Sequence, residues 1–159
     1  MIVRLWKNYI APLMLRPPRV QIAALCYRQT TGGPEVLLIT SRTTKRWILP
    51  KGWPINGTDG SGTALQEAWE EAGVKEHGDR PIRMGRYRYK KIVNGSLPLP
   101  TDVYVYAVEV HELFDAFPEM SERERQWMSP QDAAEAVDEP QLKLILKTLP
   151  ERLEDALQR

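Results

Sequence analysis

The stretch that most constrains this chain is residues 47–74, where a loop rich in glycine and proline leads into a short acidic helix. At about 100° per residue, Glu67, Glu70 and Glu71 fall within an arc of about 100° on one face of that helix. Like charges at this spacing repel by a few tenths of a kcal/mol per pair. A divalent cation would offset that cost, because hard ions such as Mg²⁺ prefer carboxylate oxygens. The pattern therefore predicts a metal site on the helix.

Both ends of this helix carry sequence signals. Gly73 is well placed as the left-handed residue that ends it. At its start, Thr63 with Gln66 fits a capping box, although Asp59 or Ser61 could also be the N-cap. A glycine-rich loop before a helix N-terminus binds phosphate well, because free N–H groups and the helix dipole point outward there. The segment thus favours metal and phosphate chemistry.

The same segment resembles the signature of the Nudix hydrolases, a family that cleaves nucleoside diphosphates linked to other groups and related pyrophosphates. The matching residues are Gly52, Glu67, Ala68, Glu70, Glu71, Gly73 and Val74. Thr58 and Gln66 stand where the family has a Glu and an Arg that brace the loop, and a hydrogen bond between them could substitute. Three stretches, SRTTKRWILPKGW, EAWEEAGV and RERQWMSPQDA, resemble the branch of diphosphoinositol polyphosphate and dinucleoside polyphosphate phosphohydrolases.

The resemblance implies a set of catalytic and metal-binding residues. Glu67 and Glu71 would be the principal metal ligands, with the Gly52 carbonyl as a further oxygen ligand. Glu70 would be either a third ligand or the base that acts on metal-bound water. An all-oxygen site of this kind suits Mg²⁺, with Mn²⁺ as an alternative.

Basic residues gather just before and inside the loop, and they are candidates for binding an anionic substrate. By resemblance, Ser41 and Arg42 match phosphate-contacting positions of the inositol pyrophosphate branch. The other candidates are Lys45, Arg46, Lys51, Arg88 and Arg125. Any single Lys or Arg is more simply a surface residue. The cluster at 42–51 is favoured because it borders the acidic helix.

Composition excludes several other classes of function. The net charge of +1 gives no global field toward nucleic acid or membranes, so a nucleic-acid partner is disfavoured and any anion site must be local. The single cysteine, Cys26, cannot form an intrachain disulfide, which fits a reducing compartment such as the cytoplasm. His77 and His111 lack metal-ligand spacing and a partnered nucleophile, so both are expected at the surface.

The chain reads as one domain in which strands and helices are mixed. Strands are expected at 20–28, 35–41, 80–91 and 103–110, with short ones at 46–49 and 126–128. Helices are expected after Ser129-Pro130 and from Pro140 up to a stop at Pro150. This pattern predicts an α/β (α+β) fold, and the resemblance implies a Nudix-type α/β/α sandwich with a mixed β-sheet.

Three parts are expected: an N-terminal extension (1–18), the Nudix domain (19–150) and a C-terminal helical tail (151–159). In the extension, Arg4, Lys7 and Pro12 interrupt the apolar residues, so no membrane span is expected. The extension has no clear small-residue cleavage site, which argues against a signal peptide. Its apolar spacing favours an amphipathic helix that packs on the domain or on a second subunit in a homodimer, with weak membrane association as a minor alternative.

Two classes of function follow. The first is a metal-dependent pyrophosphohydrolase acting on a polyphosphorylated small molecule of the diadenosine polyphosphate or diphosphoinositol polyphosphate type. ADP-ribose, a nucleoside triphosphate and capped RNA 5′ ends are other substrates for that class. The second is a catalytically weak Nudix domain that senses a nucleotide or binds a protein partner, which the departures at Thr58 and Gln66 leave open.

Overall fold

The computed structural model of the chain describes residues 19–91 and 97–159, so the helix expected within residues 1–18 lies outside the described residues. Within the described ranges the sheet contains β1 (Arg19–Thr30), β2 (Gly33–Thr40), β3 (Trp47–Ile48), β4 (Lys51–Gly52), β5 (Ile82–Lys91), β6 (Leu99–Glu109) and β7 (Arg125–Met128). The helices there are α3 (Gly60–Ala72), α4 (Pro130–Ala136), α5 (Pro140–Lys147) and α6 (Leu149–Leu157).

The sheet is mixed, as predicted. Its main path runs β3-β2-β1-β6-β5, and β4 and β7 pair with β1 and β2. β1 and β6 are parallel, whereas β1–β2 and β5–β6 are antiparallel. A turn at residues 31–32 joins β1 to β2, and Gly33 follows it with a φ of 106° that favours glycine.

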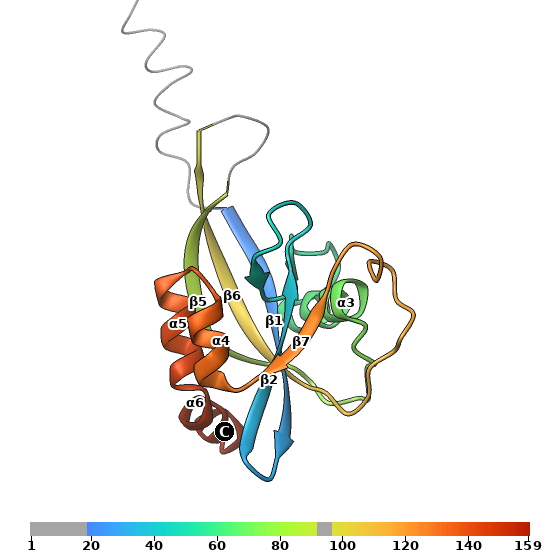
Figure 1. The fold of residues 1–159 in the computed structure, drawn as a ribbon, viewed down its shortest axis with the longest axis vertical. Coiled ribbons are helices and arrows are strands. Elements are labelled where there is room, and N and C mark those ends of the chain that lie inside the picture. The colour runs from blue at the N-terminus through green and yellow to red at the C-terminus, as the bar shows by residue number, and fades with distance from the viewer. Residues whose placement is uncertain (1–18, 92–96) are drawn as a thin grey trace, which may run out of the picture.

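Helices cover both faces of the sheet, with α3 on one face and α4, α5 and α6 on the other (Figure 1). The central strand β1 explains this arrangement, because its side chains alternate between two apolar cores. Ala23 and Leu25 belong to the core beneath α4–α6, whereas Ile22 and Ala24 belong to the core beneath α3. The predicted α/β/α sandwich is therefore confirmed.

The C-terminal helices begin at the expected signals, with one correction. Ser129 caps α4 by accepting a hydrogen bond from the Asp132 amide, as predicted. The helix α5 ends at Lys147, close to the stop expected at Pro150, but Pro150 itself lies in the first turn of α6. Proline lacks only an N–H that the first turn leaves unpaired anyway, so it starts a helix as readily as it stops one. Leu149 and Leu153 are buried, which places part of the expected tail in the core.

None of the helices in residues 19–91 and 97–159 has the length and hydropathy required to cross a bilayer.

Candidate active site

The helix α3 is fixed at both ends by its own sequence. Asp59 is the N-cap, and its carboxylate accepts a hydrogen bond from the Gly62 amide at 2.9 Å. This selects the Asp59 alternative over the capping box, since the Thr63 hydroxyl accepts from the Ile55 amide instead. Gly73 ends the helix with a φ of 70°, as predicted. The start and rotation of α3 therefore set where its acidic face points.

The three glutamates of α3 line one cleft of about 1260 Å³, as does Gly52. Glu71 is the most enclosed, with 7% of its side chain exposed. It accepts a hydrogen bond from the Lys51 amide at 3.2 Å and pairs with Arg123 at 3.1 Å. Glu71 is therefore one of the buried residues of α3, although it belongs to the predicted acidic face.

Gly52 and Glu67 are in close contact across this cleft. Gly52 is held beside β1 by pairing with Ile22, which fixes its backbone opposite α3. A Cβ atom at position 52 would overlap the Glu67 carboxylate. The Gly52 backbone therefore lies so close to the Glu67 oxygens that a side chain at position 52 would not fit between them. This proximity fits the prediction that the Gly52 carbonyl and the Glu67 carboxylate bind the same metal ion.

The carboxylates of the cleft oppose one another's ionisation. Burial raises the pKa of Glu67 to about 7, and the charges of Glu71, Glu70 and Glu119 act in the same direction. Burial also raises the pKa of Glu71, although the Arg123 guanidinium opposes that shift. A divalent cation between these oxygens would relieve both effects, so the residues present fit a Mg²⁺ or Mn²⁺ ion.

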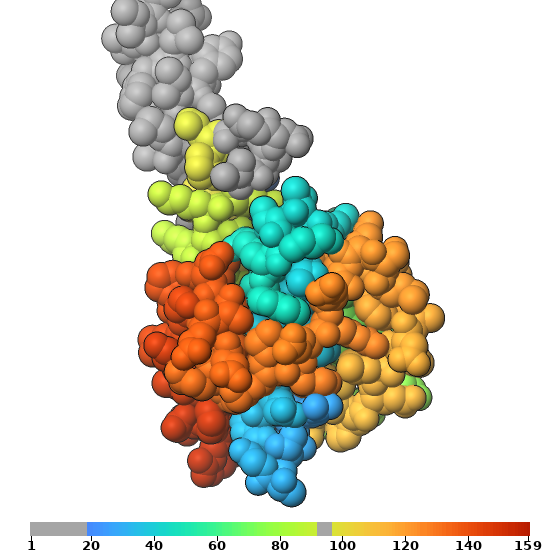
Figure 2. All heavy atoms as spheres, in the orientation of Figure 1, coloured from blue at the N-terminus to red at the C-terminus, as the bar shows by residue number. Residues whose placement is uncertain are grey.

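The basic wall of the cleft contains five of the seven predicted substrate-binding residues. These are Ser41, Arg42, Arg46, Lys51 and Arg88. In Figure 2 the segment that carries most of them, coloured teal, lies at the surface between the C-terminal helices and the loop before β7. Burial lowers the pKa of Lys51 to about 8, and Arg46 adds to that effect while Glu71 opposes it. Lys51 is thus an ammonium with few competing waters, well suited to bind an anion.

The arginines of this wall are paired with acidic residues. Arg42 lies 3.2 Å from Glu119 and Arg46 lies 3.0 Å from Glu139. Arg88 lies 2.7 Å from Asp102. An incoming polyanion would compete with these acidic residues for the guanidinium groups. The ion pairs already hold those groups at the cleft.

The structure places Lys45 and Arg125 outside the described lining of the cleft. The Lys45 ammonium donates to the Glu122 carbonyl at 3.2 Å. The Arg125 guanidinium donates to the Ala72 carbonyl at 2.7 Å, so it braces the C-terminus of α3. Both contacts satisfy the charged groups away from the cleft, so neither residue is positioned to bind an anion there.

The hydrogen bond suggested between Thr58 and Gln66 is not formed. The Thr58 hydroxyl donates to the Ile55 carbonyl at 2.9 Å, and the Gln66 amide donates to Glu70 at 2.6 Å. The loop is braced by its own backbone instead, and Gln66 holds one oxygen of Glu70.

Three cleft residues were missed by the sequence analysis. Arg123 joins Glu71 to Glu119 through its guanidinium, and only 6% of its side chain is exposed. Glu139 has a buried Oε2 atom without a hydrogen-bond partner among the described residues. The charged run SERERQ at residues 121–126 contains Arg123 but does not distinguish it from Arg125, and Glu119 lies outside that run.

The expectation that His77 and His111 are unrelated surface residues needs correction. Both are exposed, as predicted. Their ring centroids, however, lie only 3.8 Å apart, at an angle of 75°. The segment after α3 and the end of β6 run side by side here, which spacing along the sequence could not indicate.

A mixed sheet between helices, with an acidic helix facing a basic cleft, defines the class of this protein. The family model described as the NUDIX domain matches residues 17–149. The chain belongs to the Nudix family, and the resemblance noted in the sequence is confirmed.

Curated relatives and solved structures agree with this assignment. The chain is 32% identical to Nudix hydrolase 4 of Arabidopsis thaliana over 101 residues, covering 64% of this chain and 46% of that protein. It is 30% identical to diphosphoinositol polyphosphate phosphohydrolase 3-beta of Homo sapiens over 113 residues, covering 70% of this chain and 64% of that protein. The chain thus spans about half to two thirds of the length of these relatives.

Among solved structures, an Ap4A hydrolase of C. elegans in a binary complex superposes with a TM-score of 0.62. That match covers 86% of this chain and 98% of the other at 20% identity, so it shows the fold.

Proposed function

We propose that this protein is a metal-dependent pyrophosphohydrolase that cleaves phosphoanhydride bonds of a polyphosphorylated small molecule. The observation that carries the proposal is the cleft, where the glutamates of α3 and Gly52 face a wall of Ser41, Arg42, Arg46, Lys51 and Arg88. One side suits a hard dication and the other suits a chain of phosphates, which is the pairing that phosphoanhydride hydrolysis needs.

Glu67, Glu71 and the Gly52 carbonyl hold the metal, which is Mg²⁺ or alternatively Mn²⁺. A divalent ion in this site neutralises the charge that develops on the phosphoryl oxygens. Glu70 is either a third ligand or the group that takes a proton from the attacking water. Lys51 and the arginines bind the remaining phosphates and orient the scissile bond.

The substrate is of the diadenosine polyphosphate or diphosphoinositol polyphosphate type. Relatives named as diphosphoinositol polyphosphate phosphohydrolases and a structural neighbour named as an Ap4A hydrolase support this class.

The free, buried thiol of Cys26 is consistent with a reducing compartment, and we infer that the protein works in the cytoplasm. The homodimer stays a prediction, because residues 1–18, which would carry its contacts, lie outside the described residues.

Hydrolysis of a panel of substrates, followed by chromatography that resolves nucleotides, inositol phosphates and inorganic phosphate, tests the proposed activity. The panel holds diadenosine polyphosphates, diphosphoinositol polyphosphates, ADP-ribose, nucleoside triphosphates and capped RNA, each with and without Mg²⁺. We expect Mg²⁺-dependent hydrolysis of one of the first two, and a loss of activity of about 10²-fold or more in Glu67→Gln. Glu76→Gln, an exposed change just past α3, is the matched control.

The contrary result is a wild-type protein as inert as Glu67→Gln on every compound. Retained binding of a nucleotide without turnover would then identify the catalytically weak module instead.

A further inference from the structure

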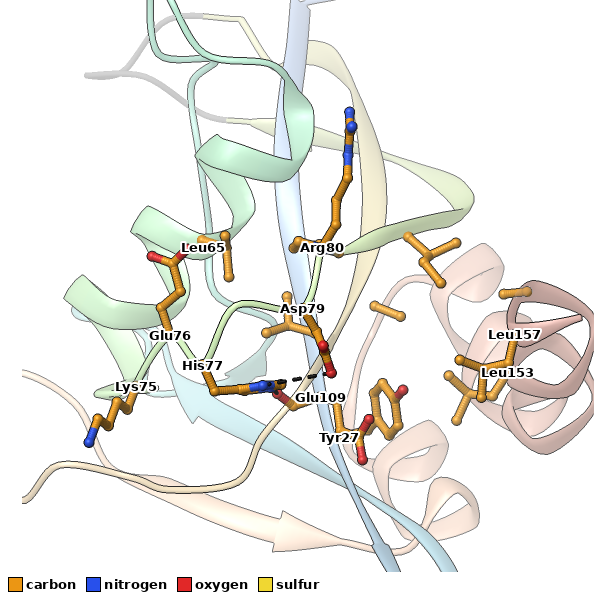
Figure 3. Close-up of a pocket in the computed structure, with 15 residues that line it drawn as sticks. Tyr27, Leu65, Lys75, Glu76, His77, Asp79, Arg80, Glu109, Leu153 and Leu157 are labelled. Atoms are coloured by element: carbon orange, nitrogen blue, oxygen red, sulfur yellow. Dashed lines mark hydrogen bonds and ion pairs between the residues drawn. The ribbon is translucent and has the colours of Figure 1, made fainter. Parts of the chain in front are cut away.

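A second group of metal-binding side chains lies outside the glutamate cleft. His77, Asp79 and His111 each present one ligand atom, and these atoms lie within 4.8 Å of one another. The His77 Nδ1 and Asp79 Oδ2 atoms are 3.7 Å apart, as the dashed line in Figure 3 marks. The cavity beside this group and the glutamate cleft have no described lining residue in common.

Backbone contacts hold the two segments of the group together. Val74 forms an antiparallel bridge with Leu113, and the Lys75 amide donates to the Glu112 carbonyl at 3.2 Å. The residues on either side of these contacts are therefore kept adjacent before any ion arrives, which lowers the cost of assembling a site.

The orientation of His77 suits metal binding. Its Nε2 atom lies 2.9 Å from the Glu109 carbonyl oxygen. Because a carbonyl oxygen only accepts, Nε2 carries the hydrogen, and in the neutral ring Nδ1 then presents its lone pair toward Asp79. Histidines that bind metals usually donate their second N–H to a carbonyl or carboxylate in this way.

The local charge also favours a cation. The neighbouring basic groups are engaged elsewhere, with Lys75 paired to Glu112 at 3.2 Å and Arg80 paired to Asp59 at 2.7 Å. Tyr27 lies in the adjoining cavity. Burial raises the pKa of Tyr27 to about 12, and the negative charges of Glu109 and Asp79 act in the same direction. His77 and Asp79 line the cavity itself, which has a volume of about 250 Å³.

We propose that His77, Asp79 and His111 bind a divalent transition-metal ion, with Zn²⁺ the best suited, at a site separate from the glutamate cleft. Two imidazole nitrogens, one carboxylate oxygen and a water complete a tetrahedral zinc site, whereas Mg²⁺ and Ca²⁺ prefer oxygen ligands. With bonds of about 2.0–2.1 Å, neighbouring ligand atoms in such a site are roughly 3.4 Å apart. To reach that separation from the present one of up to 4.8 Å, the exposed Asp79 and His111 side chains would rotate on binding the ion. The bound ion joins the segment after α3 to the end of β6.

Nuclear magnetic resonance of the histidine rings tests the site directly, because the chain has only two histidines. Untagged wild-type protein labelled with ¹⁵N is titrated with Zn²⁺ in excess Mg²⁺, which keeps the all-oxygen site occupied. We expect both sets of ring nitrogen signals to change together at one equivalent of Zn²⁺, with Nδ1 of His77 as the metal-bound atom. No change, or a change in one ring only, would overturn the proposal.

Variants supply an independent measurement. His111→Gln should weaken Zn²⁺ binding by about 100-fold, since even partners outside the ligand set cost 10–100-fold. Zn²⁺ should raise the melting temperature of the wild-type protein, and this rise should be absent in His111→Gln. Glu76→Gln, which lines the same cavity without joining the group, should bind as the wild type does. Equal affinity for Zn²⁺ in the wild type and in His111→Gln refutes the site. If the variant does not fold, the magnetic resonance titration of the wild-type protein is the deciding test.

Discussion

At the scale of single residues, Gly52 is the position where the smallest change should have the largest effect on the site. A Cβ atom there would overlap the Glu67 carboxylate. That carboxylate ends a flexible side chain, so it can rotate away at little cost to folding. Gly52→Ala should therefore lower activity and Mg²⁺ affinity by about 10-fold or more, while the free energy of unfolding changes by less than about 1 kcal/mol.

Isothermal titration with Mg²⁺ and urea unfolding measure these two effects. Gly32→Ala is the matched control, because a Cβ atom there meets only the Thr30 hydroxyl at 3.8 Å. A Gly52→Ala protein that unfolds much more easily, or binds Mg²⁺ normally, contradicts the proposed contact.

The sequence predicted the residues of α3 better than the residues that face them. Helical periodicity alone placed Glu67, Glu70 and Glu71 together, because it depends only on local geometry. The partner of Glu71, Arg123, is 52 residues away along the chain. Whether Arg123 or Arg125 pairs with Glu71 depends on how the loop before β7 folds against α3. The Glu119 amide donates to the Glu70 carbonyl at this contact. Local patterns carry no information about such contacts.

At the scale of elements, the predictions succeeded where a local signal had one meaning. Gly73 ended α3 and Ser129 started α4, since a left-handed φ and a free side-chain acceptor suit those positions specifically. The helix from Pro140 stops before Pro150 as expected, but the place of Pro150 inside α6 was not predicted, because proline fits both the residue after a helix and the first turn of the next one. The burial of Leu149 and Leu153 against the sheet decided between them, and burial of this kind depends on the whole fold.

The helix α6 should therefore contribute to stability as part of the core. Leu153 is 3% exposed and packs in the cluster beneath α4–α6, whereas Leu157 on the same helix is 60% exposed. Leu153→Ala should lower the free energy of unfolding by about 2–4 kcal/mol, and Leu157→Ala should change it by less than about 0.5 kcal/mol. Urea unfolding monitored by circular dichroism compares the two. Equal effects would mean that α6 is a detachable tail.

At the scale of the whole molecule, the fold concentrates acidic groups in a partly buried cleft, so its stability should depend on pH and on metal. The pKa of Glu67 is about 7 in the folded chain against an ordinary value of 4.5. Between these values the folded protein holds a proton that the unfolded chain has released. Stability is therefore highest below about pH 4.5 with respect to this group and is lost as the pH rises through 7.

Thermal unfolding in a chelator, followed from pH 4.5 to 8, should show this loss. We expect Glu67 to account for about 1–2 kcal/mol, a figure reduced for solvent screening because its side chain is only half-buried. Glu71, whose pKa is also raised, adds to the slope with the same sign.

Mg²⁺ should reverse the loss at the alkaline end, because the ion binds the ionised carboxylates of the folded chain. At a concentration 100 times its dissociation constant it contributes about 2.7 kcal/mol, or roughly 5–10 °C in melting temperature for a chain of this size. Glu67→Gln should flatten the pH slope and remove most of the Mg²⁺ effect, while Glu76→Gln should preserve both. If Glu67→Gln retains the full pH dependence of stability, the charge that destabilises the metal-free fold lies elsewhere. If Glu67→Gln also retains the full Mg²⁺ effect, α3 is not the metal-binding helix.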